Sequence, residues 1–462
     1  MNNKEQFKRM VMFFSGFIIA LAVSAVFSVI WTSYYNYSEE LKQNIFWRNG
    51  NVLLVMMYML LYIAFGRSFG GFRVGSLKTV GLIGSQVLSV LFTNFFAYIF
   101  ISLISRGFLR FGPTVLMTII DFIFIIFWSF ASKAVYSRIY PPKKMIIVYG
   151  STSARDLVQK MSMRVDKYLI ASSISIEEPL EVINEKLSGY DGVILCDIPS
   201  QIRNKILKYA YENSIRTYIN PKLSDIIIRG ADEIHLFDTP LILSKNIGFG
   251  FEEKIIKRFI DILLSLVAII ISSPFMLIIA LCIKLYDRGP VFYKQTRLTQ
   301  DGRKFDVIKF RSMIVNAEKD GVARLASEKD KRITPIGKLI RKIRFDELPQ
   351  LFNILKGDMS FVGPRPERPE IAEQYLEDMP EFKFRLKVKA GLTGYAQVLG
   401  KYNTTPYDKL KLDLIYIQNH TLLLDLKIML QTLKIVFIPE STEGVKDGKT
   451  TAKKVNKKIE NK

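Results

Sequence analysis

Four long apolar runs in the first third of the chain restrict its fold more than any other feature. Each is close to the length of about 20 residues that an α-helix needs to cross the hydrocarbon core of a bilayer. The runs occupy residues 11–31, 45–65, 80–104 and 114–130. Tyr34 and Tyr35 follow the first run where a signal peptide would have a small-residue cleavage site. The sequence therefore predicts a bundle of four transmembrane helices over residues 1–138.

Basic residues flank these runs and predict the orientation of the helices. They lie before the first run, between the second and third, and after the fourth: Lys4, Lys8, Arg9, Arg67, Arg73, Lys78, Lys133, Arg138, Lys143 and Lys144. The positive-inside rule predicts that both ends of this segment face the cytoplasm, although Arg106 and Arg110 lie in an outer loop. Asp121 lies inside the fourth run, where we expect a packed or interfacial group rather than part of an ion path.

The composition narrows the chemistry that the chain can perform. Its only cysteines are Cys196 and Cys282, and its only histidines are His235 and His420. A zinc cage or a disulfide framework needs more such residues, so any catalysis must depend on carboxylates or lysines. The 65 Lys and Arg against 43 Asp and Glu give a formal net charge of +22. We expect an anionic lipid bilayer and a phosphorylated substrate as partners, and no nucleic acid, since the chain has no recognition motif for one.

The next segment, residues 139–249, alternates short apolar runs with amphipathic stretches. Strands are predicted at residues 145–149, 168–173, 192–196 and 217–219. This pattern indicates a cytoplasmic Rossmann-like domain with a parallel sheet. Only Gly150 remains of the glycine-rich turn that binds dinucleotides, which favours a structural or regulatory role over a retained nucleotide site.

A fifth apolar run covers residues 262–283 and is predicted to enter the membrane without crossing it. Basic residues flank it on both sides, which places both of its ends in the cytoplasm. Ser273 and Pro274 lie near its middle, where proline removes a helical hydrogen bond and serine can satisfy the freed carbonyl groups. We expect a re-entrant helix that bends at Ser273 and Pro274.

The densest chemistry follows between residues 331 and 350. Six cations precede the adjacent carboxylates Asp346 and Glu347: Lys331, Arg332, Lys338, Arg341, Lys342 and Arg344. Thr334 and Pro335 predict a helix start, and we expect Asp346 to open the next helix, where the helix dipole and the cations keep it ionised. Such surroundings attract phosphate, toward which Asp346 is a plausible nucleophile, with Glu347 as a Mg²⁺ ligand. A solvated basic helix with an acidic cap explains the same spacing.

Five ordered motifs resolve these alternatives by resemblance. They are KFRSM at 309–313, RITPIG at 332–337, DELPQ at 346–350, KGDMSFVGPRP at 356–366 and GLTGYAQ at 391–397. Together they resemble the bacterial sugar transferase family of monotopic phosphoglycosyl transferases over residues 250–440. The resemblance implies a mainly α catalytic domain with a re-entrant membrane helix. The preceding segments resemble the N-terminal extension of the large family members, so the whole chain is expected to be a membrane α/β protein.

The resemblance also implies a reaction and its residues. Asp346 would attack a UDP-sugar, expel UMP and carry a phosphosugar that polyprenyl (undecaprenyl) phosphate then accepts at the cytoplasmic face of the bacterial inner membrane. This reaction begins the assembly of exopolysaccharide, capsule or O-antigen. The implied roles are Mg²⁺ binding for Glu347, diphosphate binding for Arg341, uridine binding for Pro364, Arg365 and Pro366, a basic floor for Lys309 and Arg311, and the membrane bend for Ser273 and Pro274. Arg344, Phe345 and Ala390 depart from the usual family residues and affect the expected sugar preference.

Other expectations stay open beside this reading. A membrane-bound NAD(P)-dependent nucleotide-sugar dehydratase or epimerase would need a complete glycine-rich turn and a helical Tyr-x-x-x-Lys pair. A non-catalytic membrane scaffold would need only the basic surface. A homodimer is compatible with every reading. The basic residues 441–462 predict a disordered tail that touches acidic lipid.

Overall fold

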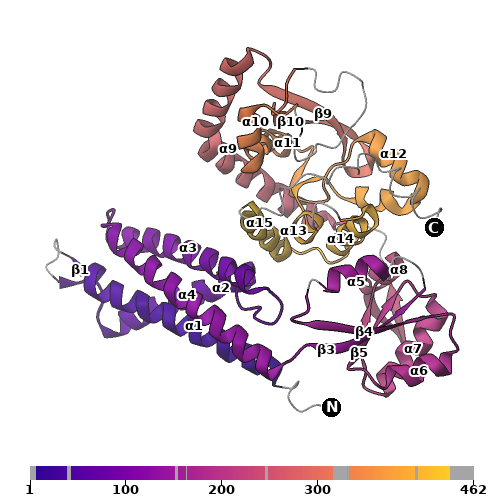
Figure 1. Cartoon of the computed structure of the whole chain (residues 1–462). Coiled ribbons are helices and arrows are strands. Elements are labelled where there is room, and N and C mark those ends of the chain that lie inside the picture. Colours follow the sequence, from indigo (N-terminus) through magenta and orange to yellow (C-terminus); the bar gives the residue numbers. More distant parts are fainter. Residues whose placement is uncertain are drawn as a thin grey trace. The chain divides into compact units, whose positions relative to one another are not determined.

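The computed structural model describes residues 7–38, 43–150, 154–162, 164–244, 248–315, 330, 332–400 and 404–436. Lys331 and the basic tail predicted for residues 441–462 lie outside these ranges. Contacts within the chain define two compact units, Met1–Lys222 and Leu223–Lys462. Figure 1 follows the chain through both units, each of which is described by itself.

The first unit begins with four apolar helices. They are α1 (Lys8–Ile30), α2 (Arg48–Phe69), α3 (Thr79–Ile104) and α4 (Gly112–Ile139), drawn in indigo to purple in Figure 1. The helices share one core, in which the rings of Phe27 and Tyr58 stack 4.0 Å apart. Among the described residues, these helices and α9 are the five that are long and apolar enough to cross a membrane. The predicted group of apolar helices at the N-terminus is therefore confirmed.

Polar side chains pair with one another inside this helical core. Asp121 is 0% exposed and accepts a hydrogen bond from Asn94, with Nδ2 3.2 Å from Oδ2. The Tyr58 hydroxyl donates to Asn94 Oδ1 over 2.6 Å. Asp121 is thus a packed group that links α3 to α4.

The second part of this unit is a four-stranded parallel sheet in the order β4-β3-β5-β6. Its strands are β3 (Lys143–Tyr149), β4 (Tyr168–Ser175), β5 (Gly192–Cys196) and β6 (Arg216–Ile219), with helices α5 (Ala154–Ser162), α6 (Leu180–Leu187) and α7 (Ser200–Glu212). Two apolar clusters share the strands of this sheet, so the predicted parallel-sheet region is confirmed. A Cβ atom on Gly150 would lie 2.2 Å from the Asp197 carbonyl oxygen. Packing alone therefore explains the retained glycine.

The second unit is predominantly helical, as predicted for the C-terminal domain. Its helices are α8 (Leu223–Arg229), α9 (Phe251–Asp287), α10 (Pro335–Lys342), α11 (Gln350–Lys356), α12 (Pro369–Asp378), α13 (Tyr395–Leu399), α14 (Pro406–Gln418) and α15 (Leu422–Val436). Its strand pairs are β7 (Asp232–Leu236) with β8 (Thr239–Leu243), β9 (Phe292–Leu298) with β10 (Lys304–Phe310), and β11 (Ser360–Val362) with β12 (Gly391–Thr393). The unit begins with α8, whose Ile226 joins a core that includes Leu410 and Leu414 of α14.

Helix α9 is unusual because most of its apolar side chains are exposed while both of its halves contact the same unit. Ala268 and Ile269 pack on the core around β10 and α11, whereas Ile279 and Ile283 pack on the core around α10. Pro274 lies between the two contact regions. A straight helix of 37 residues would extend about 55 Å, and Figure 1 shows α9 changing direction along its length.

Candidate active site

The adjacent carboxylates Asp346 and Glu347 lie in a short 3₁₀ turn between α10 and α11. The Thr334 hydroxyl caps α10 by accepting a hydrogen bond from the Gly337 N–H over 2.9 Å, as the sequence predicts. Arg344 then adopts a left-handed backbone with φ 56°, which reverses the chain before the turn Phe345–Glu347. Asp346 does not open α11 as predicted, because that helix begins at Gln350, after Pro349.

The aromatic ring of Phe345 attaches this turn to α9. It joins the core formed by Ile279, Ile283 and Ile340, and its centroid lies 6.2 Å from that of Phe275. Phe275 directly follows Pro274 in α9. The turn that carries Asp346 is therefore packed against the part of α9 where the bend was predicted.

Glu347 is surrounded by cations. Its Oε1 lies 3.1 Å from Lys309 Nζ and 3.1 Å from Arg365 Nη2, and its Oε2 lies 3.8 Å from Arg344 Nη1. Burial acts to raise the pKa of Glu347, but the three cations outweigh burial and lower the pKa below its usual range. Glu347 is consequently ionised throughout the physiological pH range.

Asp346, the residue directly before Glu347, has a different electrostatic environment. Burial and the neighbouring Glu347 carboxylate raise the pKa of Asp346 to about 6. Lys309, Arg341 and Arg365 oppose this shift with their positive charges. The cations lower the pKa of Asp346 as predicted, but burial and Glu347 outweigh them. With a pKa of about 6, the ionised form still predominates at neutral pH. Asp346 is only half-buried, and its carboxylate makes no hydrogen bond with the part of the chain that the structure describes.

The structure brings together most of the residues selected from the sequence. Lys309 and Arg365 contact Glu347, and Arg341 is close enough to act on the pKa of Asp346. Arg311 lies elsewhere, in an ion pair with Asp287 at the end of α9. The basic floor expected for Lys309 and Arg311 stays a prediction: Arg311 follows the end of β10 at Phe310 and pairs with Asp287, whereas Lys309 pairs with Glu347.

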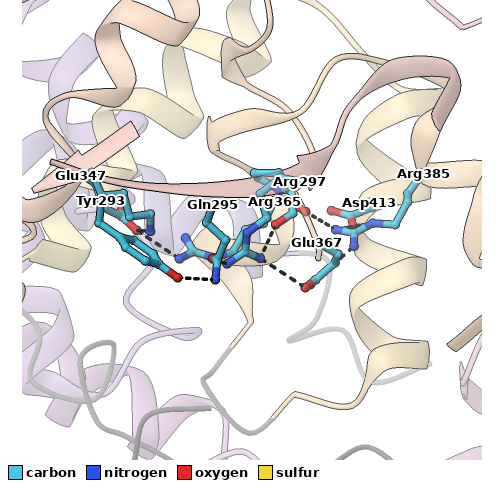
Figure 2. A network of polar contacts seen from close by, with 10 residues as sticks. Tyr293, Gln295, Arg297, Glu347, Arg365, Glu367, Arg385 and Asp413 are labelled. Atoms are coloured by element: carbon cyan, nitrogen blue, oxygen red, sulfur yellow. Dashed lines mark hydrogen bonds and ion pairs between the residues drawn. The ribbon is translucent and has the colours of Figure 1, made fainter. Parts of the chain in front are cut away.

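The loop that carries Pro364, Arg365 and Pro366 is held by two arginines that no sequence motif marks, the half-buried Arg297 and the buried Arg385. Arg297 Nη1 donates to the Pro366 carbonyl over 3.0 Å, and Arg385 Nη2 donates to the Arg365 carbonyl over 2.9 Å. Figure 2 shows Arg297, Arg365 and Arg385 within a polar network that extends from Tyr293 to Asp413. Burial, together with neighbouring arginines, lowers the pKa of Arg297 to about 10. No local sequence signal marks these arginines as partners of the loop.

A small pocket lies next to Lys309 and Arg365, the two cations 3.1 Å from Glu347. It is lined by Arg297, Val307, Lys309, Gln350, Arg365, Pro366 and Gly391. Gln350 is 4% exposed, and its amide nitrogen has no hydrogen-bond partner among the described residues. The pocket thus presents three cations and a free amide donor, a combination suited to phosphate oxygens.

The two carboxylates offer oxygen donors of the kind that Mg²⁺ prefers, but too few for a complete coordination shell. Within the described ranges there is no group of three or more His, Cys, Asp or Glu side chains that could hold a metal ion. Mg²⁺ commonly binds one or two carboxylates and completes its shell with substrate phosphates and water. Asp346 and Glu347 therefore fit a metal that binds together with a phosphate group.

Comparison with protein families gives a match in the region that contains this site. The model described as bacterial sugar transferase matches residues 252–439. A putative undecaprenyl-phosphate N-acetylgalactosaminyl 1-phosphate transferase of Bacillus subtilis (strain 168) is 47% identical over 131 residues, which cover 28% of this chain and 73% of that protein.

Larger relatives match over part of their length. A UDP-N-acetylgalactosamine-undecaprenyl-phosphate N-acetylgalactosaminephosphotransferase of Aeromonas hydrophila is 44% identical over 184 residues, which are 39% of this chain and 43% of that protein. A UDP-glucose:undecaprenyl-phosphate glucose-1-phosphate transferase of Klebsiella pneumoniae is 37% identical over 256 residues, which are 54% of this chain and 53% of that protein. The chain thus spans about half the length of these relatives.

Proposed function

Because the chain belongs to the bacterial sugar transferase family, we propose that it transfers a sugar 1-phosphate from a UDP-sugar to undecaprenyl phosphate and releases UMP. The observation that carries this proposal is the pairing of Glu347 with Lys309 and Arg365 beside the partly exposed Asp346. The activities for which these relatives are named support the same substrate classes. Family membership disfavours a dehydratase, an epimerase or a scaffold.

The proposed reaction is a double displacement at phosphorus. An Asp346 carboxylate oxygen attacks the β-phosphorus of the UDP-sugar, and the bond to the bridging oxygen breaks, so UMP leaves with the electron pair. A phosphate oxygen of undecaprenyl phosphate then attacks the same phosphorus and frees Asp346. The partly exposed carboxylate supports the role of nucleophile, since it is not engaged by the described residues.

The surrounding residues are proposed to bind the charged parts of the donor. Lys309 and Arg341 would contact the diphosphate, and Pro364, Arg365 and Pro366 would hold the uridine end. Glu347 would hold Mg²⁺, which neutralises charge on the phosphate oxygens. Arg311 has no part in this proposal because it pairs with Asp287.

We propose that α1 to α4 cross the bacterial inner membrane as a four-helix bundle, whereas α9 enters one leaflet and returns. Two observations on α9 support re-entry. Both halves of the helix pack on the same unit, and the Ser272 and Ser273 hydroxyls donate to the carbonyls of Ala268 and Ile270 over 2.6 and 2.9 Å beside Pro274. The soluble parts of both units would then lie in the cytoplasm.

Labelling from either side of the membrane tests this topology. We expect cysteines introduced by Lys254→Cys and Lys294→Cys, in a background without Cys196 and Cys282, to react with an impermeant maleimide only from the cytoplasmic side. Both positions are exposed: Lys254 lies near the start of α9, and Lys294 lies on β9, after the end of α9. Arg106→Cys, in the exposed turn after α3, provides the control and should react only from outside. Labelling of Lys294→Cys from outside would show that α9 crosses the membrane.

The reaction itself is tested by a panel of UDP-sugars added to membranes that contain the protein. We expect UMP to appear with one or a few of these sugars, and only when Mg²⁺ and undecaprenyl phosphate are both present. Membranes with the Asp346→Asn variant provide the background. Conversion of a UDP-sugar with NAD(P) and without release of UMP would contradict the proposal in favour of a dehydratase or epimerase.

A further inference from the structure

The backbone of the loop 364–367 is fixed by side chains from two other parts of the unit. Arg297, on β9, donates to the Pro366 carbonyl, and Arg385 donates to the adjacent Arg365 carbonyl. The Arg365 guanidinium in turn reaches Glu347 over 3.1 Å. Arg385 therefore contacts the backbone of Arg365, whereas the Arg365 side chain contacts Glu347 in the candidate site (Figure 2).

Arg385 is itself held in one orientation by a buried carboxylate. Asp413, on α14, accepts from Arg385 Nε over 3.0 Å and lies 2.8 Å from Nη2. Arg385 is 4% exposed and Asp413 is 1% exposed. Arg385 Nη1 lies 3.6 Å from Glu367, and its guanidinium lies 4.8 Å from the centre of the Phe382 ring. These contacts leave the guanidinium little freedom to turn.

A buried ion pair of this kind pays a desolvation cost, so its contribution to stability is smaller than its charges suggest. The ion pair matters more for geometry than for stability, because a planar guanidinium with fixed donors defines the position of each acceptor. Here the two acceptors are Asp413 and the Arg365 carbonyl. The pair thus fixes the backbone from which the Arg365 side chain extends.

We propose that Arg385 and Asp413 are positioning residues for the transfer reaction. Asp413 orients Arg385, Arg385 fixes the Arg365 backbone, and Arg365 is thereby kept on Glu347 beside Asp346. The inference rests on the proposed function, since it assigns these residues an effect on the rate of that reaction. The inference requires that Asp413 and Arg385 affect the rate of UMP release only through the Arg365 side chain.

A double-mutant cycle tests this dependence in the full chain. We expect Asp413→Asn to lower kcat/KM for UMP release by roughly tenfold to a hundredfold, the size of effect caused by small displacements in an active site. Arg365→Ala should lower it at least as much. The double variant should be no slower than Arg365→Ala alone, because Asp413 then has no positioned side chain left to act through. A residue that only maintained the fold would instead give multiplied losses.

Asp425→Asn provides the matched control. Asp425 lies 2.5 Å from Lys257 in another ion pair with side chains 10% and 8% exposed. Its effect should multiply with that of Arg365→Ala. If Asp413→Asn does not fold, as judged by thermal unfolding, Arg385→Lys gives the same cycle, since lysine keeps the charge and loses the fork of donors.

The possible outcomes separate the two proposals. Multiplied losses for Asp413→Asn and Arg365→Ala overturn the positioning role while the unmodified chain still releases UMP. If the unmodified chain releases UMP from none of the UDP-sugars, the proposed function is overturned instead.

Discussion

Asp346→Asn should reduce UMP release by roughly 10⁴-fold or more, as removal of a covalent nucleophile does in other enzymes. Asparagine has almost the same shape as aspartate but carries no negative charge, so it cannot form the acyl phosphate. The variant should fold normally, because the Asp346 carboxylate forms no hydrogen bond with the described residues that the change would break. The measurement is the rate of UMP release from the preferred UDP-sugar with Mg²⁺ and undecaprenyl phosphate.

Asp306→Asn is a suitable control for this variant. Asp306 is an exposed aspartate on β10, the strand that carries Lys309, and its carboxylate accepts a hydrogen bond from Thr296. We expect the control to retain at least about half of the activity. A donor labelled in its β-phosphate should also label the unmodified chain on Asp346. Normal turnover by Asp346→Asn would falsify the assignment of the nucleophile.

Glu347→Gln should have the second largest effect, a loss on the order of 10²–10³-fold, as for removal of other preorganised electrostatic groups. The change removes the negative charge that pairs with Lys309 and Arg365 and the oxygen donor proposed for Mg²⁺. It leaves Lys309 and Arg365 without their shared counter-charge. We expect the Mg²⁺ concentration that gives half-maximal UMP release to rise together with the loss of rate.

Glu370→Gln is the matched control for this second variant. Glu370 is exposed in the first turn of α12, a few residues beyond the loop that contains Arg365. Its replacement should leave both the rate and the Mg²⁺ dependence close to those of the unmodified chain. An unchanged Mg²⁺ dependence in Glu347→Gln would remove Glu347 from the metal site, whatever the loss of rate.

Features that depend on local sequence were predictable. The four apolar runs became helices because each has a continuous apolar character, and the parallel sheet followed from alternating short strands and amphipathic helices. Thr334 caps α10 as its position before Pro335 predicts. Lys309 and Arg365 were selected through motifs, and the structure brings both to Glu347.

Features that depend on contacts distant in the chain were not predictable. The contacts of Arg297 with Pro366 and of Arg385 with Asp413 join segments that only the fold brings together. The ion pair of Arg311 with Asp287 was not predictable, because the end of β10 at Phe310 is not visible in the sequence. The elevated pKa of Asp346 likewise depends on burial, which no spacing of charges reveals.

In the proposed re-entrant arrangement, the contact between Phe275 and Phe345 would link the proposed nucleophile to the part of α9 that enters the bilayer. In the proposed re-entrant arrangement, Phe275 lies at the deepest part of α9, and Asp346 is the residue after Phe345. The depth of the carboxylate is then set by how far α9 inserts. A lipid acceptor that diffuses in the plane of the membrane keeps its phosphate at a nearly constant depth in the bilayer. In this arrangement it would reach Asp346 by lateral diffusion alone.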